Sequence, residues 1–195
     1  MHIIRGKLLG LVLGCGAVGA AAAAVPPCPD PQAPAAHGSV HDFDFLIGHW
    51  SVHNRRLKQR LAGSRDWIGF EADDSFSALP GGLGTEEHYT TEFWKGFTAL
   101  GLHLYDPQRR IWTLYWADNR NAPGTMQTLA RGAFTGDVGV FCAPDTFNGK
   151  PILVRILWQR VDRGHARWEQ AFSTDHGASW ETNWTMDFAR REPAH

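Results

Sequence analysis

His103 and Asp118 are the side chains whose chemical types and spacing best suit proton transfer. An imidazole or a carboxylate can act as a general acid or base when its pKa is tuned toward neutrality. On a strand, His103 shares a face with Gly101 and Tyr105, and Asp118 stands two residues beyond Trp116. The structural alternative for each is a core or rim residue with satisfied hydrogen bonds. Catalytic residues therefore stay unassigned at this level.

Other catalytic patterns are missing from the sequence. The neighbours Asp73-Asp74 and Glu86-Glu87 would point to opposite faces of a strand, so neither pair predicts a working acid and base. The chain contains no Gly-x-Ser-x-Gly elbow and no phosphate-binding glycine loop. The sequence thus indicates neither serine-hydrolase nor nucleotide chemistry.

The ten histidines do not predict a metal or haem site. His49 and His53 are four residues apart, which on a strand separates their Cα atoms by ~13 Å, too far to share one ion. A haem-binding barrel would need an inward histidine late in the chain, whereas His165 and His176 fall in expected turns. We expect no metal and no cofactor.

Nine tryptophans are many for 195 residues, and several fall on expected inward faces. They predict a cavity that takes a small hydrophobic or aromatic ligand. The residues expected to line it are Trp116, Trp158, Trp168, Trp184, Gln170 for orientation, and His103.

Two other functions remain open. One is an enzyme, a cyclase, hydratase or isomerase of a hydrophobic substrate, in which an inward His103 or Asp118 moves a proton. The other is a structural domain whose interior is filled by side chains.

Five positive charges occur within eleven residues, at Arg55, Arg56, Lys58, Arg60 and Arg65. If the strand continues through them, Arg56, Lys58 and Arg60 share one face. They could attract an anionic or carboxylate ligand, but a solvated hairpin is the favoured interpretation.

The elements that must position these residues are short strands. Apolar residues alternate with polar ones in runs separated by Gly, Pro, Asn and Asp, and no helical period is sustained. The runs predict one antiparallel β-barrel of about 8–10 strands, an all-β fold. They cover residues 50–60, 66–77, 86–94, 97–105, 111–118, 126–134, 138–142, 151–161, 166–173 and 180–189.

The stretch Phe43-Asp44-Phe45-Leu46-Ile47-Gly48-His49-Trp50 resembles the opening of lipocalins and of the wider calycin superfamily. With the later RWEQAFSTDHGASWETNW, it resembles a bacterial calycin family of unknown function. The resemblance implies structural roles for Gly48, which bends the chain, and for Trp50, which lies across the closed end of the barrel. It also implies that Arg190 packs over the Trp50 indole.

Residues 173–180 (STDHGASW) fit the spacing of an Asp-box, Ser-x-Asp-x-Gly-x-Ser/Thr-Trp. One copy cannot form a propeller, which needs several blades. We expect a hairpin turn in which Asp175 accepts backbone N–H groups and Gly177 has a positive φ.

The N-terminal region predicts export. Residues 1–24 have the positive start, apolar run and small-residue end of a signal peptide, which indicates a periplasmic or secreted protein. A lipoprotein cleaved before Cys15 is the less favoured alternative. Residues 25–40 are rich in Pro and Ala and predict a tether, 41–190 the barrel and 191–195 a tail.

Cleavage would leave two cysteines and a mildly acidic chain. Cys28 and Cys142 could form a disulfide or remain as two thiols. Losing Arg5 and Lys7 changes the formal net charge from −1 to −3, which does not favour nucleic acid as a partner. We also expect no membrane span after cleavage.

Overall fold

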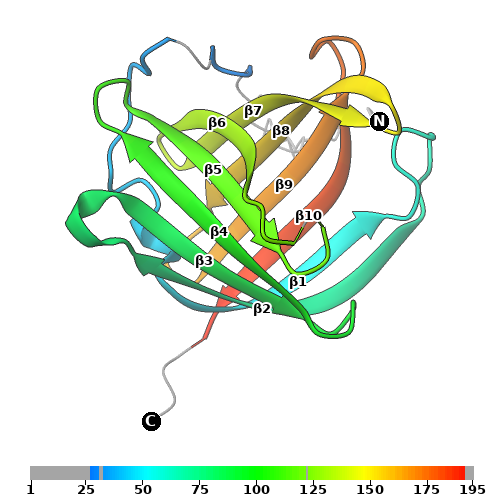
Figure 1. Cartoon of the computed structure of the whole chain (residues 1–195), viewed down its shortest axis with the longest axis horizontal. Coiled ribbons are helices and arrows are strands. Elements are labelled where there is room, and N and C mark those ends of the chain that lie inside the picture. Colours follow the sequence, from blue (N-terminus) through cyan, green and yellow to red (C-terminus); the bar gives the residue numbers. More distant parts are fainter. Residues whose placement is uncertain (1–26, 31–32, 122, 192–195) are drawn as a thin grey trace, which may run out of the picture.

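The computed structural model describes residues 27–30, 33–121 and 123–191. Its ten strands form one closed antiparallel barrel, which confirms the predicted fold class (Figure 1). The elements are η1 (Asp44–Leu46), β1 (Gly48–Leu57), β2 (Trp67–Ala78), η2 (Pro80–Gly82), β3 (Gly84–Thr91), β4 (Phe97–Asp106), β5 (Ile111–Asp118), β6 (Gln127–Thr135), β7 (Val138–Phe147), β8 (Lys150–Arg160), β9 (His165–Ser173) and β10 (Glu181–Arg190).

The alternation along the strands decides which side chains enter the barrel. On β1, for example, Trp50, Val52 and Asn54 are buried, while the alternate residues His53 and Arg55 are exposed. Every strand pairs with its two neighbours, and β1 closes the barrel by pairing with both β2 and β10. Because the side-chain period is two, this closed register fixes the inward set on all ten strands.

Phe43, just before η1, fills the closed end of the barrel. Its ring lies 4.4 Å from the His103 ring and 4.9 Å from the rings of Trp112 and Phe134, measured between centroids. Phe43 is fully buried. The resemblance assigned the closed end to Trp50, and the structure adds this phenyl ring at its centre.

Trp50, Gly48 and Arg190 form a compact group where β1 begins. The Trp50 indole N–H donates to the Leu46 carbonyl at 2.6 Å, and the Arg190 guanidinium lies 4.2 Å from the indole centroid. Gly48 has a φ of 129°, and a Cβ at this position would lie 2.6 Å from an Arg190 nitrogen. A side chain at residue 48 would therefore both strain the backbone and displace the arginine.

The loops after β1, β3, β5, β7 and β9 form the open end of the barrel. One of them contains the Asp-box. Asp175 accepts the Ser179 N–H at 2.8 Å and the hydroxyls of Ser173 and Ser179, and Gly177 has a φ of 90°. These hydrogen bonds, led by those from Ser179, lower the pKa of Asp175 to about 2.

The segment before the barrel runs along its outer surface (Figure 1, blue). Cys28 and Cys142 form a disulfide that attaches this segment to β7. Nearer the closed end, the Ala35 N–H donates to the Arg109 carbonyl, and the Tyr105 hydroxyl donates to the Gly38 carbonyl at 2.9 Å. The signal peptide predicted for residues 1–24 lies outside the described residues.

The structure corrects two details of the expected strands. β1 ends at Leu57, so Lys58 and Arg60 are in the following loop and do not continue the face of Arg56. Lys58 lies outside and forms an ion pair with Asp66 at 3.0 Å, whereas Arg60 is half-buried. β10 begins at Glu181, one residue later than expected, and bulges between Thr182 and Trp184, where Asn183 is buried.

Candidate ligand-binding cavity

A cavity of about 380 Å³ lies inside the barrel towards its open end. Five indoles, here called the Trp wall, line it from β5, β8, β9, β10 and the loop after β3. Their residues are Trp94, Trp116, Trp158, Trp168 and Trp184. The filled interior considered as an alternative is therefore not what the structure shows.

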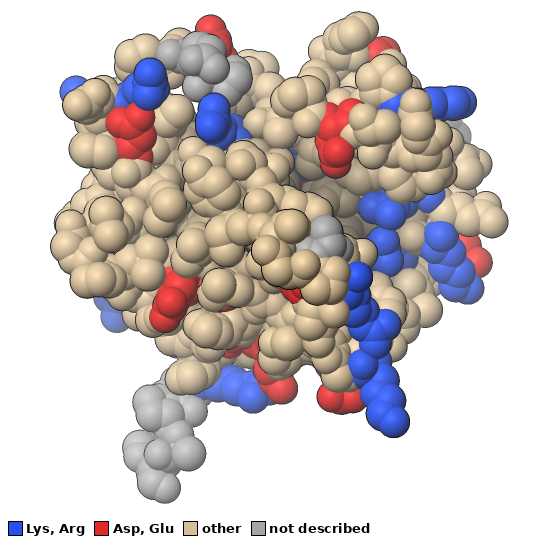
Figure 2. Space-filling view, in the orientation of Figure 1, with Lys and Arg blue, Asp and Glu red and all other residues tan. Residues whose placement is uncertain are grey.

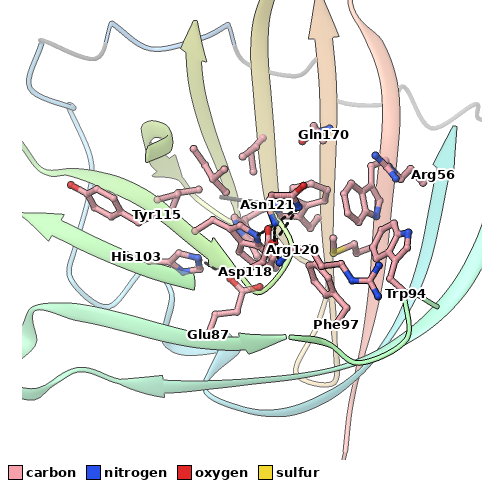
Figure 3. Close-up of a pocket in the computed structure, with 18 residues that line it drawn as sticks. Arg56, Glu87, Trp94, Phe97, His103, Tyr115, Asp118, Arg120, Asn121 and Gln170 are labelled. Atoms are coloured by element: carbon pink, nitrogen blue, oxygen red, sulfur yellow. Dashed lines mark hydrogen bonds and ion pairs between the residues drawn. The ribbon is translucent and has the colours of Figure 1, made fainter. Parts of the chain in front are cut away.

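All six residues predicted to face the cavity line it. They are His103, Trp116, Trp158, Trp168, Gln170 and Trp184. They come from five different strands, so the closed barrel is what brings them together. Sequence reasoning missed other lining residues, among them Glu87, Trp94 and Phe97, and it considered Arg56 only as a member of the basic cluster; all four are labelled in Figure 3.

Asn54 orients part of the Trp wall. Its side-chain oxygen accepts the Trp184 indole N–H at 3.0 Å and the Tyr89 hydroxyl at 3.1 Å, and Asn54 itself is fully buried. Burial raises the pKa of Tyr89, which keeps its hydroxyl protonated as a donor. Trp184 in turn meets Trp168 edge to face, with centroids 5.8 Å apart.

His103 pairs with Glu87 and not with Asp118, the other residue considered for proton transfer. The Glu87 carboxylate lies 3.3 Å from His103 Nε2, and the Thr85 hydroxyl lies 3.2 Å from Nδ1. His103 and Glu87 are 3% and 6% exposed, yet both reach the cavity wall. Figure 3 shows the imidazole and the carboxylate turned towards each other from neighbouring strands.

Asp74 adds a second buried carboxyl group beside Glu87. It is 3% exposed, and neither of its oxygens accepts a well-formed hydrogen bond from the described residues. Burial, together with repulsion from the Glu87 carboxylate, raises the pKa of Asp74 well above its usual value. A protonated Asp74 can donate its hydrogen to the Glu87 carboxylate.

Asp118 has a structural role at the open end. It accepts the backbone N–H groups of Arg120 and Asn121 at 2.8 and 2.5 Å and the Trp116 indole N–H at 3.1 Å. Burial alone would raise its pKa, but the hydrogen bonds, chiefly from Asn121, outweigh it and lower the pKa. Asp118 thus stays ionised and fixes the turn after β5.

The acidic group was missed because its members were considered within single strands. Asp74 and Glu87 belong to β2 and β3, where Asp74 pairs with Tyr89 and Phe76 pairs with Glu87. That register places both acids diagonally on the inward face. A signal was available, because Asp74 falls in the same alternation as the apolar residues Phe70, Ala72 and Phe76.

Neither a metal cluster nor a membrane-spanning helix is found in the part of the chain that the structure describes. No group of three or more His, Cys, Asp or Glu side chains there could hold an ion. No described helix is long and apolar enough to cross a bilayer.

Comparison with known proteins leaves the family undecided. No family model and no curated protein matches the chain, so the resemblance to a bacterial calycin family stays a prediction. Among solved structures, the chain is similar to the S-type phycobiliprotein lyase CPES from Guillardia theta, with 11% identity, 82% of this chain and 96% of that chain covered, and a TM-score of 0.49. It is also similar to the ywiB protein from Bacillus subtilis, with 12% identity, coverages of 74% and 93%, and a TM-score of 0.26. Neither likeness says what this chain binds.

Proposed function

We propose that this protein binds a small hydrophobic or aromatic molecule inside its barrel. The Trp-lined cavity is the observation that supports the proposal. Its volume of about 380 Å³ falls at the lower end of the range of ligand sites, roughly 300–1,000 Å³. Indoles offer large, flat apolar surfaces and have few rotatable bonds. The Trp side chains therefore lose little conformational entropy when a planar ligand binds against them.

Native mass spectrometry of protein purified from its own host tests the proposal. A bound molecule of a few hundred daltons would support it, and so would quenching of Trp fluorescence on adding that molecule back. An apo mass combined with no quenching by any small aromatic probe would count against it.

Replacing one indole tests whether the ligand binds in the cavity. Trp168→Leu removes part of the Trp wall without removing a hydrogen bond that the structure shows, and it should weaken binding about 5- to 20-fold. Trp67→Leu is the matched control, because Trp67 lies outside the cavity against Arg55. Isothermal titration of both variants measures the difference, and equal losses would argue against binding at the Trp wall.

The buried Glu87–His103 pair supports a second candidate function, an enzyme that transfers a proton on a hydrophobic substrate. Glu87 would take a proton from a carbon acid in the cavity and His103 would hold the carboxylate in place. The test is incubation of the co-purified molecule with protein in D2O. If deuterium enters that molecule with wild type but not with Glu87→Gln, catalysis is favoured. If the molecule stays unlabelled with wild type, binding is the only function that remains supported.

We also propose that the protein is exported, as its N-terminal pattern predicts. The disulfide between Cys28 and Cys142 supports this, because such bonds persist in oxidising compartments. Cell fractionation with N-terminal sequencing tests it. A mature periplasmic or secreted chain beginning near Val25 is expected, whereas a cytoplasmic chain retaining Arg5 and Lys7 would refute the proposal.

A further inference from the structure

Arg56 occupies an inward position on β1, in line with Trp50, Val52 and Asn54. It is half-buried, and its guanidinium carbon lies 5.0 Å from the Trp184 ring centroid and 5.5 Å from that of Trp94. A cation therefore stands against the Trp wall, inside the space that a ligand would enter.

The guanidinium of Arg56 forms no hydrogen bond and no ion pair with the described residues. No carboxylate there lies within 4 Å of its guanidinium, and its Nε is sealed from solvent without an acceptor. Arg155, the other arginine with a buried unpaired Nε, differs because Glu169 lies 3.8 Å from it. The Cζ atom of Arg56 lies over both indole rings, and the N–H donors of the guanidinium still need acceptors of their own.

A second hollow adjoins the cavity at Arg56 and Trp94. This hollow, here called the basic groove, has a volume of about 590 Å³ and is lined by Arg56, Lys58 and Arg60 but by no acidic residue. Figure 2 shows basic side chains gathered beside a hollow on the right of this face. Arg56 is the point where the apolar cavity and the basic groove meet.

Arg60 strengthens the positive potential of the basic groove. Its guanidinium lies 4.6 Å from the Phe147 ring centroid and 5.3 Å from that of Phe172. Burial and repulsion from Arg56, opposed by Glu181, lower the pKa of Arg60 to about 10. Both arginines still carry their charge at neutral pH, and a bound anion would relieve the repulsion between them.

We propose that the ligand is an amphiphile with an anionic group of the carboxylate or sulfonate type, which Arg56 binds while the apolar body lies against the Trp wall. This inference rests on the proposed binding function and adds the charge of the ligand to it. Two oxygens of such a group can accept the paired N–H donors of Arg56 in their common plane. The open basic groove leaves room for the anion and its remaining water.

Two fluorescent probes with the same aromatic body test the inference. 1-Anilinonaphthalene-8-sulfonate carries an anionic group, and N-phenyl-1-naphthylamine lacks it. Arg56→Gln should weaken binding of the sulfonate at least about tenfold, because a charge-assisted hydrogen bond is lost, and should change binding of the neutral amine by less than about twofold. Arg55→Gln is the matched control, since it removes the same charge from the exposed face of the neighbouring position. It should change neither affinity.

The outcomes distinguish failure of the anion site from failure of the proposed binding function. If both probes bind wild type and Arg56→Gln weakens them equally or not at all, the anion site is refuted and the binding function stands. If neither probe binds wild type, the binding function itself fails.

A competition on wild type needs no variant, so it decides the matter even if Arg56→Gln misfolds. Decanoate should displace N-phenyl-1-naphthylamine at a lower concentration than decan-1-ol does. The reverse order would overturn the inference.

Discussion

Asn54 shows how a single buried polar residue can orient the apolar wall of a cavity. Its side-chain oxygen accepts hydrogen bonds from Trp184 on β10 and from Tyr89 on β3. Both donors are held inside the barrel, where a lost acceptor is not replaced by water. A polar residue at the centre of the interior thus fixes the angle of one indole of the Trp wall.

Replacing Asn54 should therefore lower the free energy of unfolding by more than the size of its side chain suggests. Asn54→Leu fills a similar volume but leaves the Trp184 N–H and the Tyr89 hydroxyl without an acceptor. We expect the free energy of unfolding to fall by about 2–4 kcal/mol, measured by urea denaturation. An unchanged midpoint would show that neither hydrogen bond matters to stability.

The buried Asp74 predicts how the stability of the protein depends on pH. Because its pKa is raised in the folded state, the folded protein holds this proton more tightly than the unfolded chain, and stability falls as pH rises between 3.8 and the raised value. Asp74→Asn mimics the protonated form and lacks this loss. Within that window, the variant should gain about 1.4 kcal/mol over wild type for each pH unit.

Thermal melts of both proteins across the pH range measure this difference. Asp73→Asn is the control, because Asp73 is the exposed neighbour on the same strand and pairs with Arg191 at the surface. A stability gain that does not grow with pH would contradict a raised pKa of Asp74.

At the scale of elements, Arg190 joins the last strand to the turn before the first. Its guanidinium donates to the carbonyls of Ile47 at 2.7 Å and Phe45 at 2.5 Å while lying over the Trp50 indole. Since β1 and β10 close the barrel, these contacts hold η1 and Phe43 in the closed end. The planar fork of arginine makes all three contacts at once, which an ammonium cannot do.

Arg190→Lys should accordingly behave almost like Arg190→Met. Both variants should lose about 2–4 kcal/mol of unfolding free energy, because lysine keeps the charge but not the paired donors. Urea denaturation followed by Trp fluorescence measures the loss. If the lysine variant were as stable as wild type, a positive charge alone would be sufficient to stabilise the closed end of the barrel.

Among the elements, the predicted end of the first strand was wrong. Ten runs of alternating residues correspond to ten strands, but the run over 50–60 passed the end of β1 at Leu57. Arg56, Lys58 and Arg60 alternate in sequence past Leu57, but the pairing of the backbone with β2 determines where the strand ends. The error concealed the fact that Arg56 enters the barrel while Lys58 does not.

At the scale of the whole molecule, the disulfide links the N-terminal segment to the barrel across 114 residues of sequence. Cross-linking such distant residues restricts the unfolded chain strongly. The hydrogen bonds of Ala35 and Tyr105 hold the same segment in the folded state, so the link is compatible with the native arrangement.

Reduction should lower the stability of the protein. We expect the double variant Cys28→Ser, Cys142→Ser to lose about 2–4 kcal/mol, and wild type in a reducing agent to melt at the same temperature as the variant. Circular dichroism melts with and without reductant measure both. A melting temperature that does not respond to reductant would refute a stabilising bond.

The sequence alone determined the class of fold and the aromatic character of the interior. Alternation is a local property, so inward residues such as Trp158, Trp168 and Trp184 could be recognised from their own strands. The Gly48-x-Trp50 pattern and the Asp-box turn are equally local, because a positive φ or a short loop is written in consecutive residues.

Only the tertiary structure decided which polar groups meet. Glu87 reaches His103 and Asp74 because β3 lies between β2 and β4 in a particular register, and a shift of one residue would turn Glu87 outwards. Arg56 meets Trp94 and Trp184 because the barrel closes through β1 and β10. Contacts between strands depend on register and closure, which no single run of residues contains.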